Sequence, residues 1–101
     1  MDPERISDLN ISDVVKATAG RDAGKLFYVI ALDGETLLLA NGKDRPLDRP
    51  KRKKCKHVQK VLRAETRVAL KLRTGDKVLN SELRRDLAFL AGQMQENNLG
   101  G

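Results

Sequence analysis

The sequence predicts a mainly β fold, a small barrel followed by a helical C-terminal tail. Three observations lead to this prediction. Residues 15–18 alternate between apolar and polar side chains, with the two-residue period of a half-buried strand. Residues 26–32 form an apolar run rich in β-branched and aromatic side chains, and a hairpin signal, Asp33-Gly34, follows it. Residues 83–94 instead carry apolar side chains at helical spacing.

The first half of the chain reads as a β-meander. A strand over Ile11–Ala19 precedes a polar loop that is bracketed by Gly20 and Gly24, where glycine permits positive φ or close approach of a ligand to the backbone. The next strand, Leu26–Leu32, is apolar on both faces, which suits the central strand of a small barrel. The chain then returns as a strand over Glu35–Ala40. Because a lone meander exposes its edges, we expect it to curl and close with further strands.

Helical signals follow in the last third of the chain. Residues 64–72 fit both an amphipathic helix and a strand, and good helix formers with Gly75 behind them favour the helix. Asn80 or Ser81 can cap a second helix. Its apolar face is formed by Leu83, Leu87, Leu90 and Met94. The sequence therefore predicts a single domain over residues 1–101, with a barrel over 11–58 and a helical extension over 64–95.

Composition restricts the classes of function. A chain of 101 residues has room for one modest core, so we expect no added catalytic machinery. Twenty Lys and Arg face 14 Asp and Glu, and a net charge of +6 favours a polyanionic partner, nucleic acid before an acidic membrane. Cys55 is the only cysteine, which excludes an internal disulfide and fits a reducing compartment. Residues 1–13 are acidic, the wrong sign for a signal peptide. Residues 1–10 fit a short helix or a loose lead-in. We expect a cytoplasmic protein without a membrane span.

The positive charge is concentrated between residues 43 and 63. This segment holds ten Lys and Arg against Asp44 and Asp48, a balance of +8, so it carries the entire excess of the chain. Such a concentration is typical of a nucleic-acid contact, and a solvated charge run is the alternative. Residues 55–60 alternate in a way that predicts entry into a fourth strand.

Phosphate recognition requires cations that reach outward and backbone N–H groups that turn outward. The Gly20–Lys25 loop offers both, and Lys51–Lys56 adds a second, flexible basic arm. Asp22 inside the loop is expected to pair with Arg21 or to accept backbone N–H groups. The loop lacks the spacing of a P-loop.

Cys55 and His57 are the only other candidates for chemistry. Two ligands do not make a structural zinc site, which requires four, so we predict no metal and no cofactor. A Cys–His nucleophile pair would lack a third member, so we predict no catalytic residue.

The loop Gly20-Arg21-Asp22-Ala23-Gly24-Lys25 between valine-rich strands resembles the KOW motif of ribosomal proteins and transcription elongation factors. The chain is more similar to small bacterial KOW-domain proteins that are related to eukaryotic-type large-subunit ribosomal proteins. Those proteins carry a similar Ala-Gly-Arg-Asp-x-Gly loop, an aromatic pair and a lysine-rich stretch, here Ala19–Gly24, Phe27–Tyr28 and Lys51–Lys56. Phe27 departs from the commonest KOW pattern, which has a glycine in the second strand.

The resemblance implies an SH3-like barrel and a non-catalytic role in binding RNA, above all ribosomal RNA, as a ribosome-associated or ribosomal-protein-like factor. One aromatic of the pair is expected in the core, and the other either stacks on a base or is needed in the core as well, because the chain has only three aromatic residues. The expected RNA-binding residues are Lys16, Arg21, Lys25, Arg45, Arg49, Lys51, Arg52, Lys53, Lys54, Lys56 and His57. The alternative is a protein-interaction module of the transcription or translation machinery that docks through its C-terminal helix, whose leucines would then be exposed.

Overall fold

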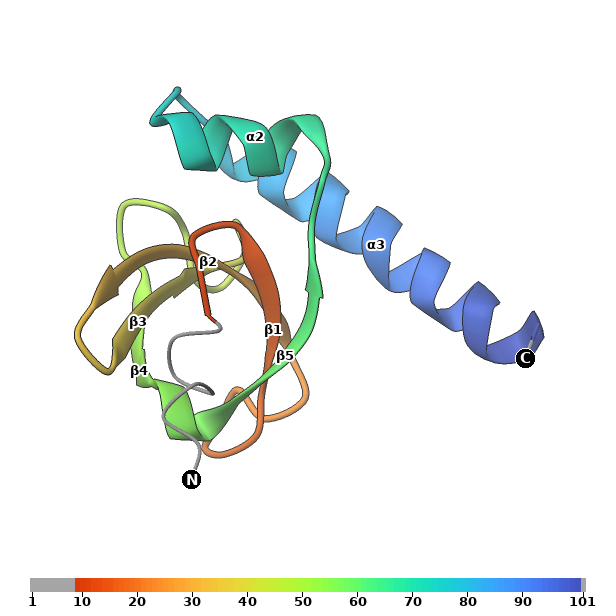
Figure 1. The fold of residues 1–101 in the computed structure, drawn as a ribbon, viewed down its shortest axis with the longest axis horizontal. Coiled ribbons are helices and arrows are strands. Elements are labelled where there is room, and N and C mark those ends of the chain that lie inside the picture. Colours follow the sequence, from red (N-terminus) through yellow and green to blue (C-terminus); the bar gives the residue numbers. More distant parts are fainter. Residues whose placement is uncertain (1–8, 101) are drawn as a thin grey trace.

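The computed structural model describes residues 9–100, with side chains described as far as Met94. The elements follow in the order β1 (Asp13–Ala17), β2 (Leu26–Asp33), β3 (Thr36–Ala40), β4 (Lys51–Lys54), the 3-10 helix η1 (Cys55–His57), β5 (Val58–Arg63), α2 (Arg67–Thr74) and α3 (Asn80–Gly100). The prediction of a mainly β fold that ends in a helix is confirmed (Figure 1). Residues 1–8, for which a short helix or a loose lead-in is expected, lie outside the described part.

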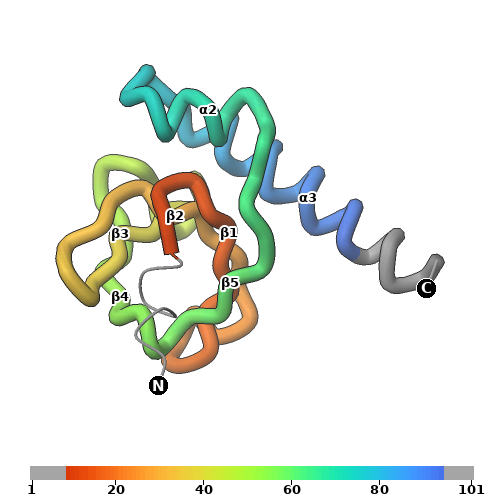
Figure 2. The backbone as a smooth tube through the Cα atoms, in the orientation of Figure 1, coloured from red at the N-terminus to blue at the C-terminus, as the bar shows by residue number. Residues whose placement is uncertain are grey.

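All strands belong to one antiparallel sheet in the order β4-β3-β2-β1-β5. The strands β1, β2 and β3 form the predicted meander, β4 extends it by one strand, and β5 returns to pair with β1. The sheet curves strongly, and η1 joins the two strands at its edges (Figures 1 and 2). The sheet extends beyond Val58, where the barrel is expected to end, because β5 begins at that residue and continues to Arg63.

Alternate side chains of the strands, together with Leu9, form an inner cluster on one side of the curved sheet. Its buried members are Leu9, Val15, Ala17, Phe27, Val29, Leu37 and Leu39. Because successive residues of a strand point to opposite faces, the residues between these positions reach the other side of the sheet.

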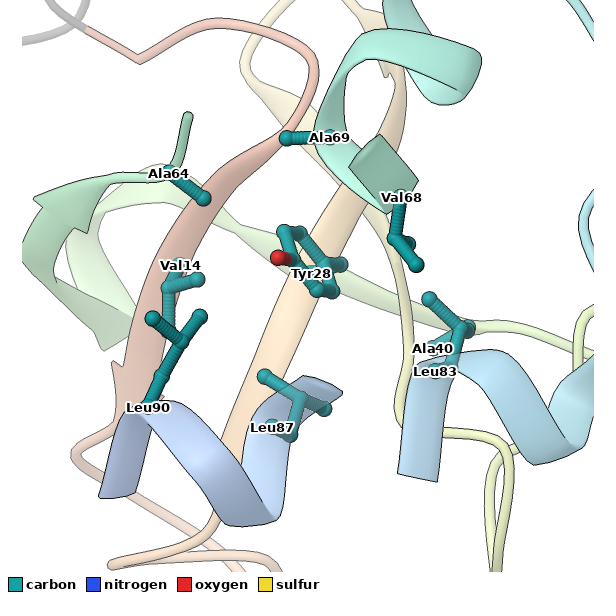
Figure 3. Close-up of a cluster of buried hydrophobic side chains, with 9 residues drawn as sticks. All are labelled: Val14, Tyr28, Ala40, Ala64, Val68, Ala69, Leu83, Leu87 and Leu90. Atoms are coloured by element: carbon teal, nitrogen blue, oxygen red, sulfur yellow. The ribbon is translucent and has the colours of Figure 1, made fainter. Parts of the chain in front are cut away.

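Helices α2 and α3 cover that other side and complete an outer cluster (Figures 1 and 3). Its buried members are Val14, Tyr28, Ala40, Ala64, Val68, Ala69, Leu83, Leu87 and Leu90. In Figure 3 Leu90 and Leu87 of α3 lie toward Val14 and Tyr28 of the sheet, and Leu83 lies toward Ala40. The two clusters explain why β2 is apolar on both faces: Phe27 belongs to the inner cluster and Tyr28 to the outer one.

Local signals fix the ends of α2, so the ambiguous segment 64–72 is helical from Arg67 onward. The side chain of Thr66 accepts a hydrogen bond from the backbone N–H of Ala69 at 3.1 Å, as an N-cap residue does. Gly75 ends the helix with φ 80°, in the left-handed region that favours glycine.

The loop after β3 fixes the start of α3. Asn80 Oδ1 accepts a hydrogen bond from the backbone N–H of Leu47 at 2.8 Å, and Glu82 accepts one from that of Leu79 at 2.9 Å. Gly42 packs against the same helix end with φ 77°, and a Cβ there would lie 2.2 Å from the carbonyl oxygen of Asn80. Only glycine fits this position without moving the helix.

A polar contact also ties α3 to the sheet. The hydroxyl of Tyr28 donates to the carboxylate of Asp86, to which Thr66 Oγ1 donates at 2.8 Å. Burial and the neighbouring carboxylate raise the pKa of Tyr28, so its hydroxyl stays protonated and keeps donating. Although α3 is 21 residues long, no helix in the described part of the chain has the length and apolar character that a membrane span requires.

Candidate nucleic-acid interface

The basic run forms an edge strand, β4, in place of the flexible arm predicted from the sequence. Lys53 pairs with Leu37 of β3, and Lys51 pairs with Leu39. Directly opposed residues share a face of the sheet, so these two lysines lie on the side of the inner cluster, where their stems are half-buried. The residues that point to the other side and are exposed are Arg52 and Lys54. Lysines are common on edge strands because they discourage pairing with further chains.

Lys53 joins β4 to the glycine-bracketed loop. Its Nζ donates a hydrogen bond to the carbonyl oxygen of Ala19 at 2.7 Å. Gly20 follows with φ 83°, and a Cβ there would lie 3.2 Å from the same Nζ. The loop and the basic strand, far apart in sequence, are thus held side by side.

Asp22 holds the loop from its other side. Its side chain is only 4% exposed and pairs with Arg45 at 3.0 Å and with Lys25 at 3.6 Å. Asp22 was expected to pair with Arg21 or to accept backbone N–H groups, and its buried carboxylate instead pairs with Arg45, which reaches it from the loop after β3. Arg21 is left exposed at the loop, with no acidic partner among the described residues.

Lys25 is engaged as well. Its Nζ lies 2.6 Å from Asp44 Oδ2, and Asn41 Nδ2 donates to Asp44 Oδ1 at 2.9 Å. These hydrogen bonds, first from Lys25 and then from Asn41, lower the pKa of Asp44 to about 2. The hydrogen bond with Asp44 in turn raises the pKa of Lys25. Lys25 and Arg45, both expected to contact RNA, therefore connect two loops of the protein.

η1 lies against the end of β1. The carbonyl oxygen of His57 accepts a hydrogen bond from the backbone N–H of Thr18 at 2.9 Å, and the N–H of Cys55 donates to the carbonyl of Glu35 at 2.9 Å. These contacts fix Lys56 and His57 close to Lys16, which is exposed on β1.

The contacts of Lys53 with Ala19 and of His57 with Thr18 connect β4, η1, the glycine-bracketed loop and the end of β1, and we call the expected residues on and next to these elements the basic surface. It comprises Lys16, Arg21, Arg49, Lys51, Arg52, Lys53, Lys54, Lys56 and His57. Among the described residues, Asp33 is the only acidic side chain that pairs with it, 3.5 Å from Arg52, and both partners are mostly exposed. An exposed pair of this kind contributes little, so the charge of the basic surface is nearly uncompensated.

The aromatic residues do not take part. Phe27 and Tyr28 are both fully buried, one in each cluster. The core contains both aromatics, which is one of the two outcomes that the sequence allows, so neither side chain is exposed to stack on a base.

Cys55 packs against the inner cluster, and burial raises the pKa of its thiol, with Glu35 adding to the effect. A thiol in this state is a poor nucleophile. In the described part of the chain, no group of three or more His, Cys, Asp or Glu side chains could hold a metal ion.

A feature that the sequence did not indicate is a groove of about 760 Å³ between α3 and the two joined loops. It is lined by Lys25, Leu26, Asn41, Lys43, Asp44, Arg84, Leu87 and Ala88. Arg84 comes from the apolar helix and was not among the expected site residues. The packing of α3 brings it to the loop, and no local sequence signal reports that.

No protein-family model matches this sequence, and no curated protein matches it significantly. Its function must therefore be inferred from the charges and geometry of the chain itself.

Proposed function

We propose that this protein is a non-catalytic, cytoplasmic RNA-binding protein of the KOW type, with an SH3-like barrel that contacts ribosomal RNA through the basic surface. The observation that carries the proposal is the set of Lys and Arg side chains on β4, η1 and the neighbouring loop. In the described part of the chain, these side chains form one ion pair, between Arg52 and the exposed Asp33. Cations that are not neutralised internally remain available to neutralise phosphates and release their counterions.

The shape of the basic surface favours RNA over duplex DNA. Its cations lie on strands, the 3-10 helix η1 and loops, and among the described residues no α-helix contributes to it. Direct reading of DNA bases commonly uses a helix or a β-ribbon in the major groove, whereas structured RNA is recognised by irregular shape and by its backbone. The resemblance of the Ala19–Gly24 loop to the ribosomal KOW branch supports the same choice.

The strand order supports the barrel. A four-stranded meander with a last strand that returns to pair with the first leaves β4 and β5 as the edges of the sheet in the described part of the chain, and η1 connects them directly. Bringing the two edges of such a curved sheet together covers their unpaired backbone groups, which would otherwise pair with other chains and promote aggregation.

The alternative, docking on a protein through the apolar face of α3, is not favoured. Leu83, Leu87 and Leu90 are 0%, 7% and 7% exposed, so the chain itself covers the face on which that function depends.

The proposal is tested by reversing the charge of two residues on the basic surface and, as a control, of two residues outside it, and by measuring RNA binding. Arg52→Glu with Lys54→Glu changes two exposed residues of the basic surface, and neither donates to the fold beyond the weak pair with Asp33. The control, Arg67→Glu with Lys77→Glu, changes two exposed residues on and after α2 by the same charge.

Binding of both variants to a structured ribosomal RNA fragment is titrated at several salt concentrations. We expect the first pair to flatten the slope of log K against log salt by about 1.4–1.8, the loss of two phosphate contacts, and the control to leave it near the parent value. Equal losses in both variants would show that only net charge matters and would refute the proposed surface.

A further inference from the structure

The groove between α3 and the joined loops combines an apolar floor with a cationic rim. Leu26, Leu87 and Ala88 supply apolar side chains from β2 and α3. The rim is formed by polar residues of the two loops and by Arg84. A volume of about 760 Å³ lies within the range of about 300–1,000 Å³ that is usual for small-molecule sites.

The polar groups of the groove divide into those that are occupied and those that are available. Asp44 is held by Lys25 and Asn41, at 2.6 Å and 2.9 Å. The charges of Lys25 and Asp44 therefore compensate one another. Lys43 is exposed and has no acidic partner in the described part of the chain, so a full positive charge remains at the rim.

Arg84 is available and also held in place. Its Nη1 donates to the carbonyl oxygen of Gly42 at 2.6 Å, which fixes the guanidinium at the rim while its other N–H groups remain free among the described residues. A fixed, planar guanidinium loses little conformational freedom when a ligand stacks on it or bonds to it.

We propose that this groove binds one unstacked nucleotide of the RNA, with the base between the apolar floor and the Arg84 guanidinium and the phosphate on Lys43. The inference rests on the proposed function and adds a second contact to it. Bases that are splayed out of RNA commonly stack on apolar side chains or on guanidinium planes, so the residues here match that ligand. Since Phe27 and Tyr28 are buried, the groove offers the stacking surface that the aromatic pair does not.

The position of the groove supports this role. The Gly20–Lys25 loop separates it from the basic surface: Ala19 contacts Lys53 on one side, and Lys25 contacts Asp44 on the other. An RNA strand that lies across the basic surface and passes Arg21 therefore reaches the rim of the groove, where one of its nucleotides can enter.

The test uses the full chain, labelled with ¹⁵N, and adenosine 5′-monophosphate, ribose 5-phosphate and inorganic phosphate as probes. We expect the mononucleotide to shift the amide resonances of Leu26, Lys43 and Ala88, with an affinity about tenfold or more above that of the two probes without a base. Equal affinity for all three probes would reveal an anion patch and refute the nucleotide site, as would the absence of shifts at these amides.

A charge-matched pair of variants locates the effect. Ala88→Glu introduces a carboxylate one helical turn after Arg84, and it should lower mononucleotide affinity by about tenfold because it engages the guanidinium and repels phosphate. Gln93→Glu adds the same charge at an exposed position of α3 outside the groove and should change nothing. Equal losses in both variants would overturn the inference, and so would stronger groove shifts with a tetraglutamate peptide, which would indicate a protein ligand.

The two proposals fail separately. Failure of the proposed function appears as unchanged RNA binding by the Arg52→Glu, Lys54→Glu variant, whereas failure of the groove appears in the mononucleotide titration of the parent chain.

Discussion

The Nζ of Lys53 donates a hydrogen bond to the carbonyl oxygen of Ala19 at 2.7 Å, so one member of the basic run is also part of the fold. Its neighbour Lys54 is exposed and has no partner among the described side chains. We expect Lys53→Ala to lower the free energy of unfolding by about 1–2 kcal/mol, because a hydrogen bond from a charged donor and a half-buried stem are both lost. Lys54→Ala should cost less than about 0.5 kcal/mol. Urea unfolding distinguishes them, and equal effects would show that Lys53 is not structural.

Leu87 tests the packing of α3 on the sheet. It is 7% exposed in the outer cluster, so Leu87→Ala should destabilise by about 2–5 kcal/mol. Phe89, two residues later, is 56% exposed, and Phe89→Ala should change stability by less than about 0.5 kcal/mol. Thermal or urea unfolding measures both. A small effect at Leu87 would mean that the helix is free of the sheet, and protein docking through α3 would regain support.

Gly42 tests the contact between the loop and the start of α3. Gly42→Ala combines a positive φ with a Cβ only 2.2 Å from the carbonyl of Asn80. Gly24 is the matched control, since it has φ 90° and nothing within 4 Å of an added Cβ. Gly24→Ala should cost about 1–2 kcal/mol from the backbone conformation alone. Gly42→Ala should cost clearly more, and equal unfolding midpoints for the two variants would contradict the contact.

The Lys25–Asp44 pair gives stability a dependence on acid pH. The folded-state pKa of Asp44 is lowered to about 2, below its usual value of about 3.9, so the pair stabilises fully above that usual value. The contribution is lost as pH falls from about 4 toward 2, where the carboxylate becomes protonated. The difference in urea midpoint between the parent and Asp44→Asn should therefore shrink over this range. A difference that is constant between pH 6 and pH 2 would show that the pair does not stabilise the fold.

RNA affinity should depend steeply on salt. With about five phosphate contacts, the slope of log K against log salt is expected at roughly −3.5 to −4.5. Arg21→Ala should also reduce the preference for cognate over random RNA, because a guanidinium on a short, fixed loop can grip phosphate in one pose. Competition titrations at several salt concentrations measure both quantities. An interaction that is insensitive to salt would exclude the basic surface as the RNA contact.

Local patterns predicted the elements whose signals are local. The alternation in β1, the double-faced run in β2 and the glycines at the turns are written in neighbouring residues, and so are the caps of α2. Entry into a further strand was predicted over residues 55–60, whereas β5 runs from Val58 to Arg63, and its bounds depend on pairing with β1, which is distant in the sequence. Without knowledge of its pairing, a strand rich in Lys and Arg cannot be distinguished from a solvated charged segment.

The candidate site was predictable in composition and not in arrangement. Charge density identified β4 and η1, but the register with β3 decides that Lys51 and Lys53 point inward while Arg52 and Lys54 point outward. The partner of Asp22 is an arginine from another loop. Such pairings depend on contacts between distant segments, which the order of residues alone does not report.

Phe27 and Tyr28 are adjacent in the chain and fill two separate clusters on opposite sides of β2. The β part is therefore not a portable module. A chain cut after Arg63 would leave Val14, Tyr28 and Ala40 uncovered in the middle of the sheet, where they would attract one another between molecules. Hydrogen exchange should accordingly find that β2 and the first half of α3 open together in a single cooperative step. A version of this sheet without the helices would need polar side chains in place of the apolar ones on the outer face of β2.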